Sequence, residues 1–320
     1  MKILEATKTG FARVVRAKRY IILVYTVNLI MALILGAAIS SSIQSSLKQS
    51  VAAENLRNGF DDLWYRSFKA NARGLDATFD PSVVGIGAVF NGLDSFLRGN
   101  LLKGSSAVLG IGLLYLMMWT FFSAGFISVY TTEDDSPSFF QHAARFFPRF
   151  LVLAALAGVV YFLFFNFVQR WLSDAVNSLT RETIDERVHF VFTVAKYAVL
   201  MILVWGVNVL FDYSKILTVL QDHKNALTAP IRAMRVVFPH LVKTFGLYLL
   251  LGVFWSALVV IYWLVAPGAA QASWIAVLGA FVIGQLYLVS RIGTRCLFYA
   301  GQSAMCAALA GAEEPDIPKR

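Results

Sequence analysis

The sequence predicts an all-α, polytopic membrane protein with six transmembrane helices. Hydrophobic residues make up 58% of its 320 residues and charged residues only 15%, and the mean hydropathy of +0.65 is too high for a soluble domain of this size. Six apolar stretches are long enough to cross about 30 Å of hydrocarbon as helices of about 20 residues. These stretches are continuous, whereas transmembrane strands alternate polar and apolar residues, so helices are favoured.

The predicted spans follow a basic N-terminal segment, residues 1–19. In chain order they cover residues 20–40, 106–130, 149–169, 190–211, 241–266 and 273–290. The first span ends in small residues, as a signal peptide does, but its apolar run of about 20 residues exceeds the usual length of about 7 to 15. We therefore expect an uncleaved signal anchor. Residues 291–320 are predicted to form a tail on the same side as the N-terminus.

Basic residues are divided unevenly between the two sides of these spans. The side that carries both termini holds 17 of the 28 lysines and arginines but only nine of the 19 acidic residues. The positive-inside rule then predicts that both termini are cytoplasmic, and long loops such as residues 41–105 are exempt from this rule. We expect a multi-pass protein of the bacterial cytoplasmic (inner) membrane.

Two segments that precede a predicted span share one pattern. Residues 136–150 read SPSFFQHAARFFPRF and residues 228–241 read TAPIRAMRVVFPHL. Each contains a proline, then a stretch with helical periodicity that includes arginine, and then Phe-Pro followed by a basic residue. We call them the two Phe-Pro segments. A basic amphipathic helix of this kind lies in the membrane interface, so an interfacial helix is expected over 136–148 and a cytoplasmic amphipathic segment over 213–240.

The prolines explain how each segment could return the chain to the membrane. In the first, Ser136 can cap a helix that has Pro137 at its first position. Pro148 cannot continue a helix without disturbing it, but it suits the first turn of the next helix. We therefore predict a break at Pro148, with the third span beginning directly after it.

A weak threefold repeat is suggested by the N-terminal sequence TGFARVVRAKRYIIL, which resembles the two Phe-Pro segments without their prolines. Each unit would consist of a basic segment, a span, an outer loop and a returning span. Such repeats are common in membrane proteins. The shared physics of basic re-entry segments would produce the same pattern, and the sequence leaves both explanations open.

The first outer loop, residues 41–105, is too long and too regular for a linker. Helical spacing is shown by Ile43, Leu47, Val51 and Leu56, by Leu63, Trp64 and Phe68, and by the apolar residues that follow Asp80 and Pro81. A helical extracytoplasmic cap is predicted. It could cover a cavity or simply pack at the membrane interface.

Six side chains of the Phe-Pro segments are candidates to face lipid or a partner. They are Arg145, Arg149, Arg232, Arg235, His142 and His240. A base near the surface gains about 1 kcal/mol from anionic lipid. We expect anionic headgroups on the cytoplasmic side, or a protein partner, as their ligands. Because these bases are juxtamembrane, nucleic acid is not expected despite the net charge of +9.

Polar residues inside the spans mark a second candidate region, because they are costly in hydrocarbon. They are Lys196, Asn208, Gln285, Asn166 and Asn28. They could line a polar path, as in a transporter, or form hydrogen bonds between helices. Lys196 could also extend along its own stem to the interface. Small residues at intervals of four in the first and sixth spans favour close helix packing or a homo-oligomer.

Recognisable catalytic patterns are missing from the sequence. It has no P-loop, no dinucleotide-binding glycine motif, no nucleophile elbow and no metalloprotease motif. The four histidines are scattered, and the two cysteines, Cys296 and Cys306, match no metal or redox spacing. We therefore expect no catalytic residue, no metal and no cofactor, and a protein that is not an enzyme.

With six spans and two Phe-Pro segments, the layout resembles a group of uncharacterised bacterial inner-membrane proteins. It is more distantly similar to the membrane domain fused to some bacterial glycerophosphodiester phosphodiesterases. This resemblance covers the overall layout and carries no specific motif, so it implies no functional residue and no phosphodiesterase activity. The sequence favours a non-enzymatic membrane scaffold that interacts with lipids or partners, and the alternative is a transporter or a subunit of a transport system.

Overall fold

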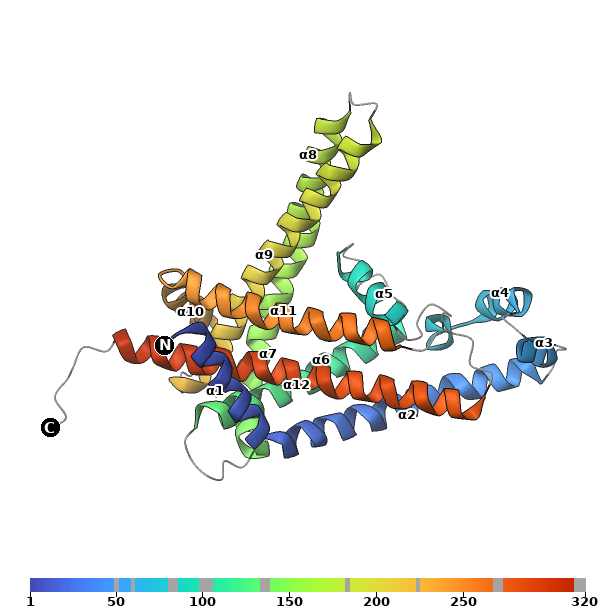
Figure 1. The fold of residues 1–320 in the computed structure, drawn as a ribbon, viewed down its shortest axis with the longest axis horizontal. Helices are drawn as coiled ribbons and strands as arrows, with labels where there is room; N and C mark the ends of the chain where they lie inside the picture. The colour runs from blue at the N-terminus through green and yellow to red at the C-terminus, as the bar shows by residue number, and fades with distance from the viewer. Residues whose placement is uncertain are drawn as a thin grey trace. The chain divides into compact units, whose positions relative to one another are not determined.

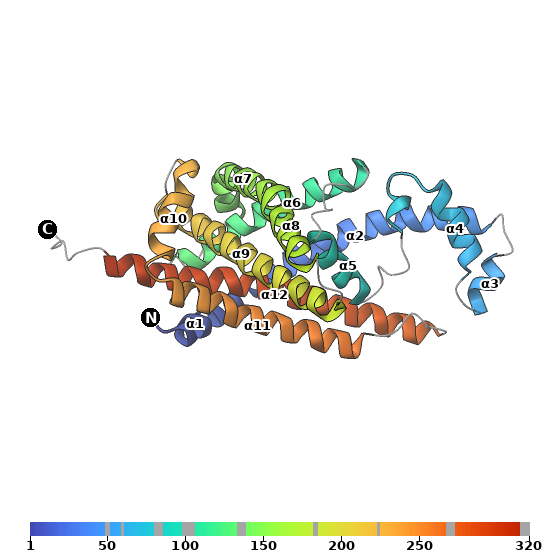
Figure 2. The same cartoon turned by 90° about the horizontal axis from the view of Figure 1, so that it is seen from above.

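The computed structural model describes residues 1–48, 52–58, 61–79, 86–97, 106–132, 139–181, 185–222, 225–266 and 273–313. These residues form helices joined by turns and short irregular segments, with no strand among them (Figures 1 and 2). Six helices are long and apolar enough to cross a membrane, and each overlaps one predicted span. The predicted all-α, polytopic class is confirmed.

The membrane-crossing helices extend beyond the predicted spans. They are α2 (Lys18–Leu47), α6 (Ser106–Thr131), α7 (Phe139–Leu163), α9 (Glu186–Leu220), α11 (Leu241–Val265) and α12 (Trp274–Glu313). A helix of 40 residues such as α12 is about 60 Å long, about twice the hydrocarbon thickness. The predicted tail therefore continues the last helix as far as Glu313.

The chain divides into two compact units. Unit 1 contains Met1–Ala17, Met117–Val253 and Arg295–Arg320, and unit 2 contains Lys18–Leu116 and Phe254–Thr294. Most buried polar side chains lie in unit 1, among them Asp212, Gln302 and Ser303.

A long helical hairpin forms part of unit 1. Helix α7 passes through a π-helical turn, Phe164–Val168, into α8 (Gln169–Thr180), and α9 runs back beside them (Figure 1). The side chain of Asp185 accepts a hydrogen bond of 2.9 Å from the backbone N–H of Arg187 at the start of α9, which is a helix cap. Much of the predicted loop between the third and fourth spans is thus helical.

The predicted break at Pro148 is wrong. Helix α7 begins at Phe139 and continues through Pro148 without a break, so residues 139–148 are not a separate interfacial helix. Phe146 and Phe150, four residues apart, are 4% and 0% exposed. They anchor both sides of the proline to one packing surface, which offsets the hydrogen bond that proline removes. The expected cap by Ser136 and Pro137 lies outside the described residues.

The second Phe-Pro segment does break its helix. Helix α10 (Ala229–Val237) ends in a turn at Phe238, Pro239 and His240, and α11 begins at Leu241. Pro230 stands in the first turn of α10, where its missing N–H costs little. One sequence pattern therefore produces two different local structures. Val237, the counterpart of Phe146, is buried, but Leu241, the counterpart of Phe150, is 46% exposed, so the second segment is anchored on only one side of its proline.

Helix α1 (Ile3–Arg16) packs against α12 inside unit 1. A methyl group added to Gly10 would lie 2.8 Å from the backbone N of Gly301, and one added to Gly246 of α11 would lie 2.9 Å from Cδ1 of Ile3. Ala6 is 0% exposed. Such small residues allow two helix backbones to approach closely, so the N-terminal segment is docked on the protein.

The predicted cap is helical and belongs to unit 2. It comprises α3 (Ala52–Asn58), α4 (Asp62–Asn71), the 3₁₀ turn Asp76–Thr78 and α5 (Ile86–Leu97). Ala52, Trp64 and Phe68 form its small core against the end of α2, as the position of α3 and α4 in both views shows (Figures 1 and 2). Leu63 was expected on the same side but is 82% exposed, because consecutive helical residues point about 100° apart. Val51, Asp80 and Pro81 lie outside the described residues.

Candidate functional site

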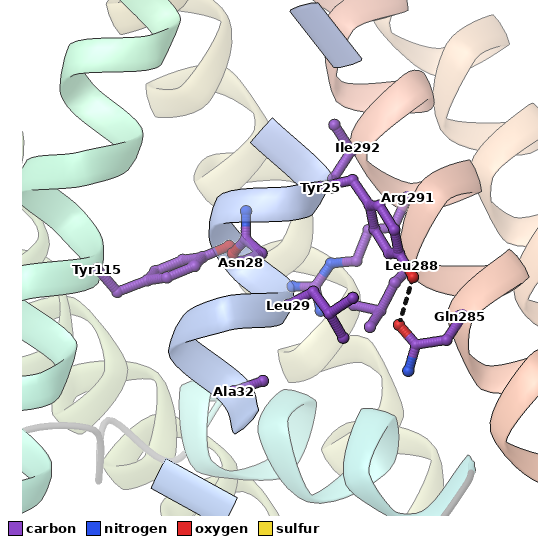
Figure 3. A pocket seen from close by; sticks show the side chains of 9 residues that line it. All are labelled: Tyr25, Asn28, Leu29, Ala32, Tyr115, Gln285, Leu288, Arg291 and Ile292. Atoms are coloured by element: carbon purple, nitrogen blue, oxygen red, sulfur yellow. Dashed lines mark hydrogen bonds between the residues drawn. The ribbon is translucent and has the colours of Figure 1, made fainter. Parts of the chain in front are cut away.

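The candidate site is a pocket of about 350 Å³ inside unit 2. Three helices supply its lining (Figure 3). The residues are Tyr25, Asn28, Leu29 and Ala32 of α2, Tyr115 of α6, and Gln285, Leu288, Arg291 and Ile292 of α12. This volume falls within the range of small-molecule sites, about 300 to 1,000 Å³.

Helical spacing brings these side chains together. On α2, Tyr25, Asn28 and Ala32 are three and four residues apart, and on α12 Gln285, Leu288 and Ile292 repeat the same spacing. Residues so spaced share one face of a helix. The pocket therefore forms where two such faces meet, and Tyr115 is the contribution of α6.

The polar part of the pocket contains hydrogen-bonding groups and one charge. The hydroxyl of Tyr25 donates to Oε1 of Gln285 over 3.0 Å, and Nδ2 of Asn28 donates to the carbonyl of Val24 over 2.8 Å. Figure 3 shows the Arg291 side chain extending from α12 toward α2, beside Asn28. Among the described residues that line the pocket, Arg291 is the one with a formal charge.

The remaining lining is aliphatic. Leu29, Ala32, Leu288 and Ile292 supply apolar surface next to these polar groups. A ligand that fits both parts needs an anionic or hydrogen-bonding group joined to an apolar portion. An amphiphile such as an anionic lipid has this chemistry, and basic pockets between transmembrane helices bind lipid headgroups in this way.

Two of the five predicted polar-path residues, Asn28 and Gln285, line this pocket. The other three lie in unit 1, where each has a local contact. Asn208 accepts a hydrogen bond of 2.8 Å from the hydroxyl of Tyr161, and Nδ2 of Asn166 donates to the carbonyl of Phe162. Nζ of Lys196 lies 4.7 Å from the ring centroid of Tyr197.

Two of the predicted lipid-facing arginines form ion pairs within the protein. Nη1 of Arg149 lies 2.8 Å from Oδ1 of Asp222, and Arg145 pairs with the other oxygen of the same carboxylate. The hydrogen bond from Arg149, with the charge of both arginines, holds the pKa of Asp222 below its usual range. These pairs join α7 to the turn after α9.

The other predicted interfacial side chains differ in their surroundings. Arg232 donates to Oγ1 of Thr228 over 2.6 Å, and the ring Nδ1 of His240 lies 3.3 Å from the carbonyl of Val236. His142 is half-buried on α7, whereas Arg235 is exposed. Arg145 and Arg235 are both exposed, but Arg145 is paired with Asp222, so Arg235 is better placed to meet an external ligand.

Three polar residues of the pocket are not among the candidates from the sequence: Tyr25, Tyr115 and Arg291. Arg291 was assigned to a tail because hydropathy ends the last span at residue 290. A signal was nonetheless present, since Gln285, Leu288 and Arg291 recur every three residues, which places them on one side of a continued helix.

Among the described residues, no group of three or more His, Cys, Asp or Glu side chains is arranged to hold a metal ion. Both cysteines are buried as free thiols. Compared with known protein families, curated proteins and solved structures, the chain shows no match.

Proposed function

We propose that this chain is a non-enzymatic, multi-pass protein of the bacterial inner membrane that binds anionic lipid in the pocket of unit 2. The observation that carries the proposal is the lining of the pocket, where Arg291 and the Tyr25–Gln285 pair lie next to Leu29 and Leu288. The arginine matches a phosphate charge, the amide and hydroxyl groups match the glycerol and ester oxygens, and the leucines match the upper part of the acyl chains.

The sequence predicts lipid contacts at the Phe-Pro segments, whereas this proposal places the lipid site in the pocket of unit 2. Arg145 and Arg149 already share the carboxylate of Asp222, so much of their charge is used within the protein. Arg235 remains available for weak, non-specific attraction to an anionic surface.

Lipids that copurify with the protein test the proposal. Arg291→Gln removes the pocket charge, and Arg235→Gln removes the same charge from an exposed position outside the pocket. We expect Arg291→Gln to reduce the retained anionic phospholipid about fivefold, as the loss of about 1 kcal/mol predicts, and Arg235→Gln to change it little. Equal retention in the wild type and both variants would exclude lipid binding by this pocket.

The orientation with both termini in the cytoplasm can be tested with single cysteines. The native Cys296 and Cys306 are buried, so they should react little with a membrane-impermeant maleimide. Leu63→Cys introduces a thiol at a position that is 82% exposed in the cap. Spheroplasts should label it directly, while Arg235→Cys should be labelled only after permeabilisation. The reverse pattern would invert the proposed topology.

A transporter is the second candidate, supported by the convergence of Asn28 and Gln285 on one pocket. An aqueous path predicts that cysteines placed at Lys196, Asn208 and Gln285 react with water-soluble thiol reagents. If the cysteine at Gln285 reacts and those at Lys196 and Asn208 do not, solvent reaches the pocket but not the other two positions, and transport along this path is excluded.

A further inference from the structure

The interior of unit 1 holds a second polar site, which the proposed function does not use. Asp212 and Lys215 of α9 form an ion pair of 3.5 Å. Nζ of Lys215 and Cζ of Arg295 lie 6.0 Å and 5.7 Å from the ring centroid of Tyr299 on α12. Tyr248 of α11 interacts electrostatically with Asp212 and Arg295. Three helices thus bring two cations, one carboxylate and two phenols together.

The charges at this site do not balance. The side chain of Asp212 is 10% exposed and is paired with Lys215, while it interacts with Arg295 at longer range. The single negative charge of Asp212 therefore faces the positive charges of Lys215 and Arg295, which leaves a net charge of about +1 at this site. A cation in such surroundings is stabilised by an anion that reaches it.

Unpartnered polar groups lie on the same face of α12. Tyr299 and Gln302 follow Arg295 by four and seven residues, a spacing that keeps them on one side of the helix. Tyr299 and Gln302 are 0% exposed and Ser303 is 1% exposed. Among the described residues, neither amide atom of Gln302 has a hydrogen-bond partner, and the hydroxyl of Ser303 has none. The hydroxyl of Tyr299 is close enough to Arg295 for an electrostatic interaction but forms no well-aligned hydrogen bond.

Buried donors and acceptors in proteins are nearly always satisfied, by protein, water or ligand. Here the amide nitrogen of Gln302 and the hydroxyls of Tyr299 and Ser303 can donate, and they stand one or two turns from an arginine that lacks a full counter-charge. Solvent reaches part of the Arg295 side chain, although protein atoms crowd around its guanidinium group. Arg295 is therefore the member of this group that solvent reaches, while Gln302 and Ser303 are buried behind it on the same helix.

We propose that Lys215, Arg295, Tyr299, Gln302 and Ser303, here called the Arg295 cluster, bind a phosphate group. A phosphate offers several acceptor oxygens to the guanidinium, ammonium, hydroxyl and amide donors, and its charge compensates the excess cation. Asp212 opposes an anion, but its pairing with Lys215 limits this effect. The phosphate belongs either to a free small molecule or to a lipid headgroup. This site is independent of the pocket of unit 2, since the two share no residue.

Binding is tested by thermal unfolding of the delipidated full-length protein in neutral detergent. One arm adds inorganic phosphate and the other adds short-chain phosphatidic acid at the same free concentration. In one arm or both, we expect the unfolding midpoint to rise with ligand concentration, and Arg295→Gln to weaken the apparent affinity at least tenfold. A rise with inorganic phosphate shows that a free anion is sufficient. A rise with phosphatidic acid alone identifies a lipid headgroup as the ligand of this cluster only if it persists in Arg291→Gln, which removes the charge of the unit 2 pocket.

Gln302→Leu keeps the test valid if Arg295→Gln does not fold. This substitution removes the unsatisfied amide atoms at nearly constant volume, so without ligand the variant should be as stable as the wild type or more stable. Its ligand affinity should nevertheless fall several-fold. Arg291→Gln should leave the response to phosphate unchanged, which separates this site from the unit 2 pocket. The proposal is overturned if neither ligand shifts the midpoint of the wild type, or if Gln302→Leu binds as tightly as the wild type.

Discussion

Arg149 and Asp222 lie 73 residues apart in the chain and form a hydrogen-bonded ion pair of 2.8 Å. Arg145 binds the same carboxylate. Asp222 has a φ of 44°, in the left-handed region that side-chain-bearing residues seldom adopt. Two arginines of α7 therefore hold an aspartate in an unfavourable backbone conformation at the turn that follows α9.

Substitutions at Asp222 separate the effect of its charge from that of its conformation. Asparagine tolerates the left-handed region about as well as aspartate, so Asp222→Asn removes only the charge. We expect a loss of up to about 1 kcal/mol, because the Arg145 and Asp222 side chains are about half exposed. Asp222→Gly also relieves the backbone and should be less destabilised. Thermal unfolding in detergent measures both, and an asparagine variant as stable as the wild type would show that the ion pairs contribute nothing.

The same pair predicts a dependence on pH. Its arginines lower the pKa of Asp222 in the folded protein from the ordinary value of 3.8. The stabilisation is therefore fully present above pH 3.8 and is lost as pH falls through the lower, folded pKa. The difference in unfolding free energy between wild type and Asp222→Asn should be constant from pH 7 to about pH 5 and should shrink below about pH 4. A difference that persists at the lowest pH would contradict this assignment.

The two Phe-Pro segments make opposite predictions for proline replacement. Pro148 lies inside a continuous helix, where it removes a backbone hydrogen bond, so Pro148→Ala should stabilise the protein by about 1 to 3 kcal/mol. Pro239 lies in a turn between two helices, and Pro239→Ala should give no such gain. Unfolding midpoints of the two variants provide the comparison. Destabilisation by Pro148→Ala would instead support the helix break that the sequence suggested.

Docking of α1 depends on the close approach of Gly10 to Gly301. A methyl group at Gly10 would lie within 3 Å of the Gly301 backbone, so Gly10→Ala should destabilise the protein by about 1 to 3 kcal/mol and release α1. Gly206 of α9 has open space around it, and Gly206→Ala should gain up to about 1 kcal/mol of helix propensity. Limited proteolysis near residue 17 reports release. If the two variants have the same stability and the same rate of cleavage near residue 17, α1 is not docked through Gly10.

The sequence predicts those parts of the fold that are fixed by the membrane, and it fails for those that are fixed by contacts between distant segments. The spans were predictable because the hydrocarbon thickness fixes their length. The ends of the helices were not predictable, because hydropathy detects only the apolar part of a helix and not its polar continuation beyond the hydrocarbon. Asp212, Lys215, Arg291 and Arg295 were for this reason assigned to segments outside the spans, although α9 and α12 carry all four.

The behaviour of prolines and the members of the site were also hard to predict, because both depend on contacts between distant segments. Pro148 stays within a helix while Phe146 and Phe150 are buried beside it, and no local pattern reveals that burial. Asn28 and Gln285 were recognised as polar residues in apolar spans, and they do line one pocket. Their neighbour Tyr115 could not be found, because no local pattern distinguishes a tyrosine that lines a pocket from one that faces lipid or packs between helices.

Native mass spectrometry of lipid titrations tests the central claim, that the pocket of unit 2 binds anionic lipid. Phosphatidylglycerol and phosphatidylcholine would be titrated onto the wild type, Arg291→Gln and the surface control Arg235→Gln. We predict that the wild type and Arg235→Gln prefer phosphatidylglycerol and that Arg291→Gln loses this preference, with about fivefold weaker binding. An unchanged preference for phosphatidylglycerol in Arg291→Gln would contradict the account.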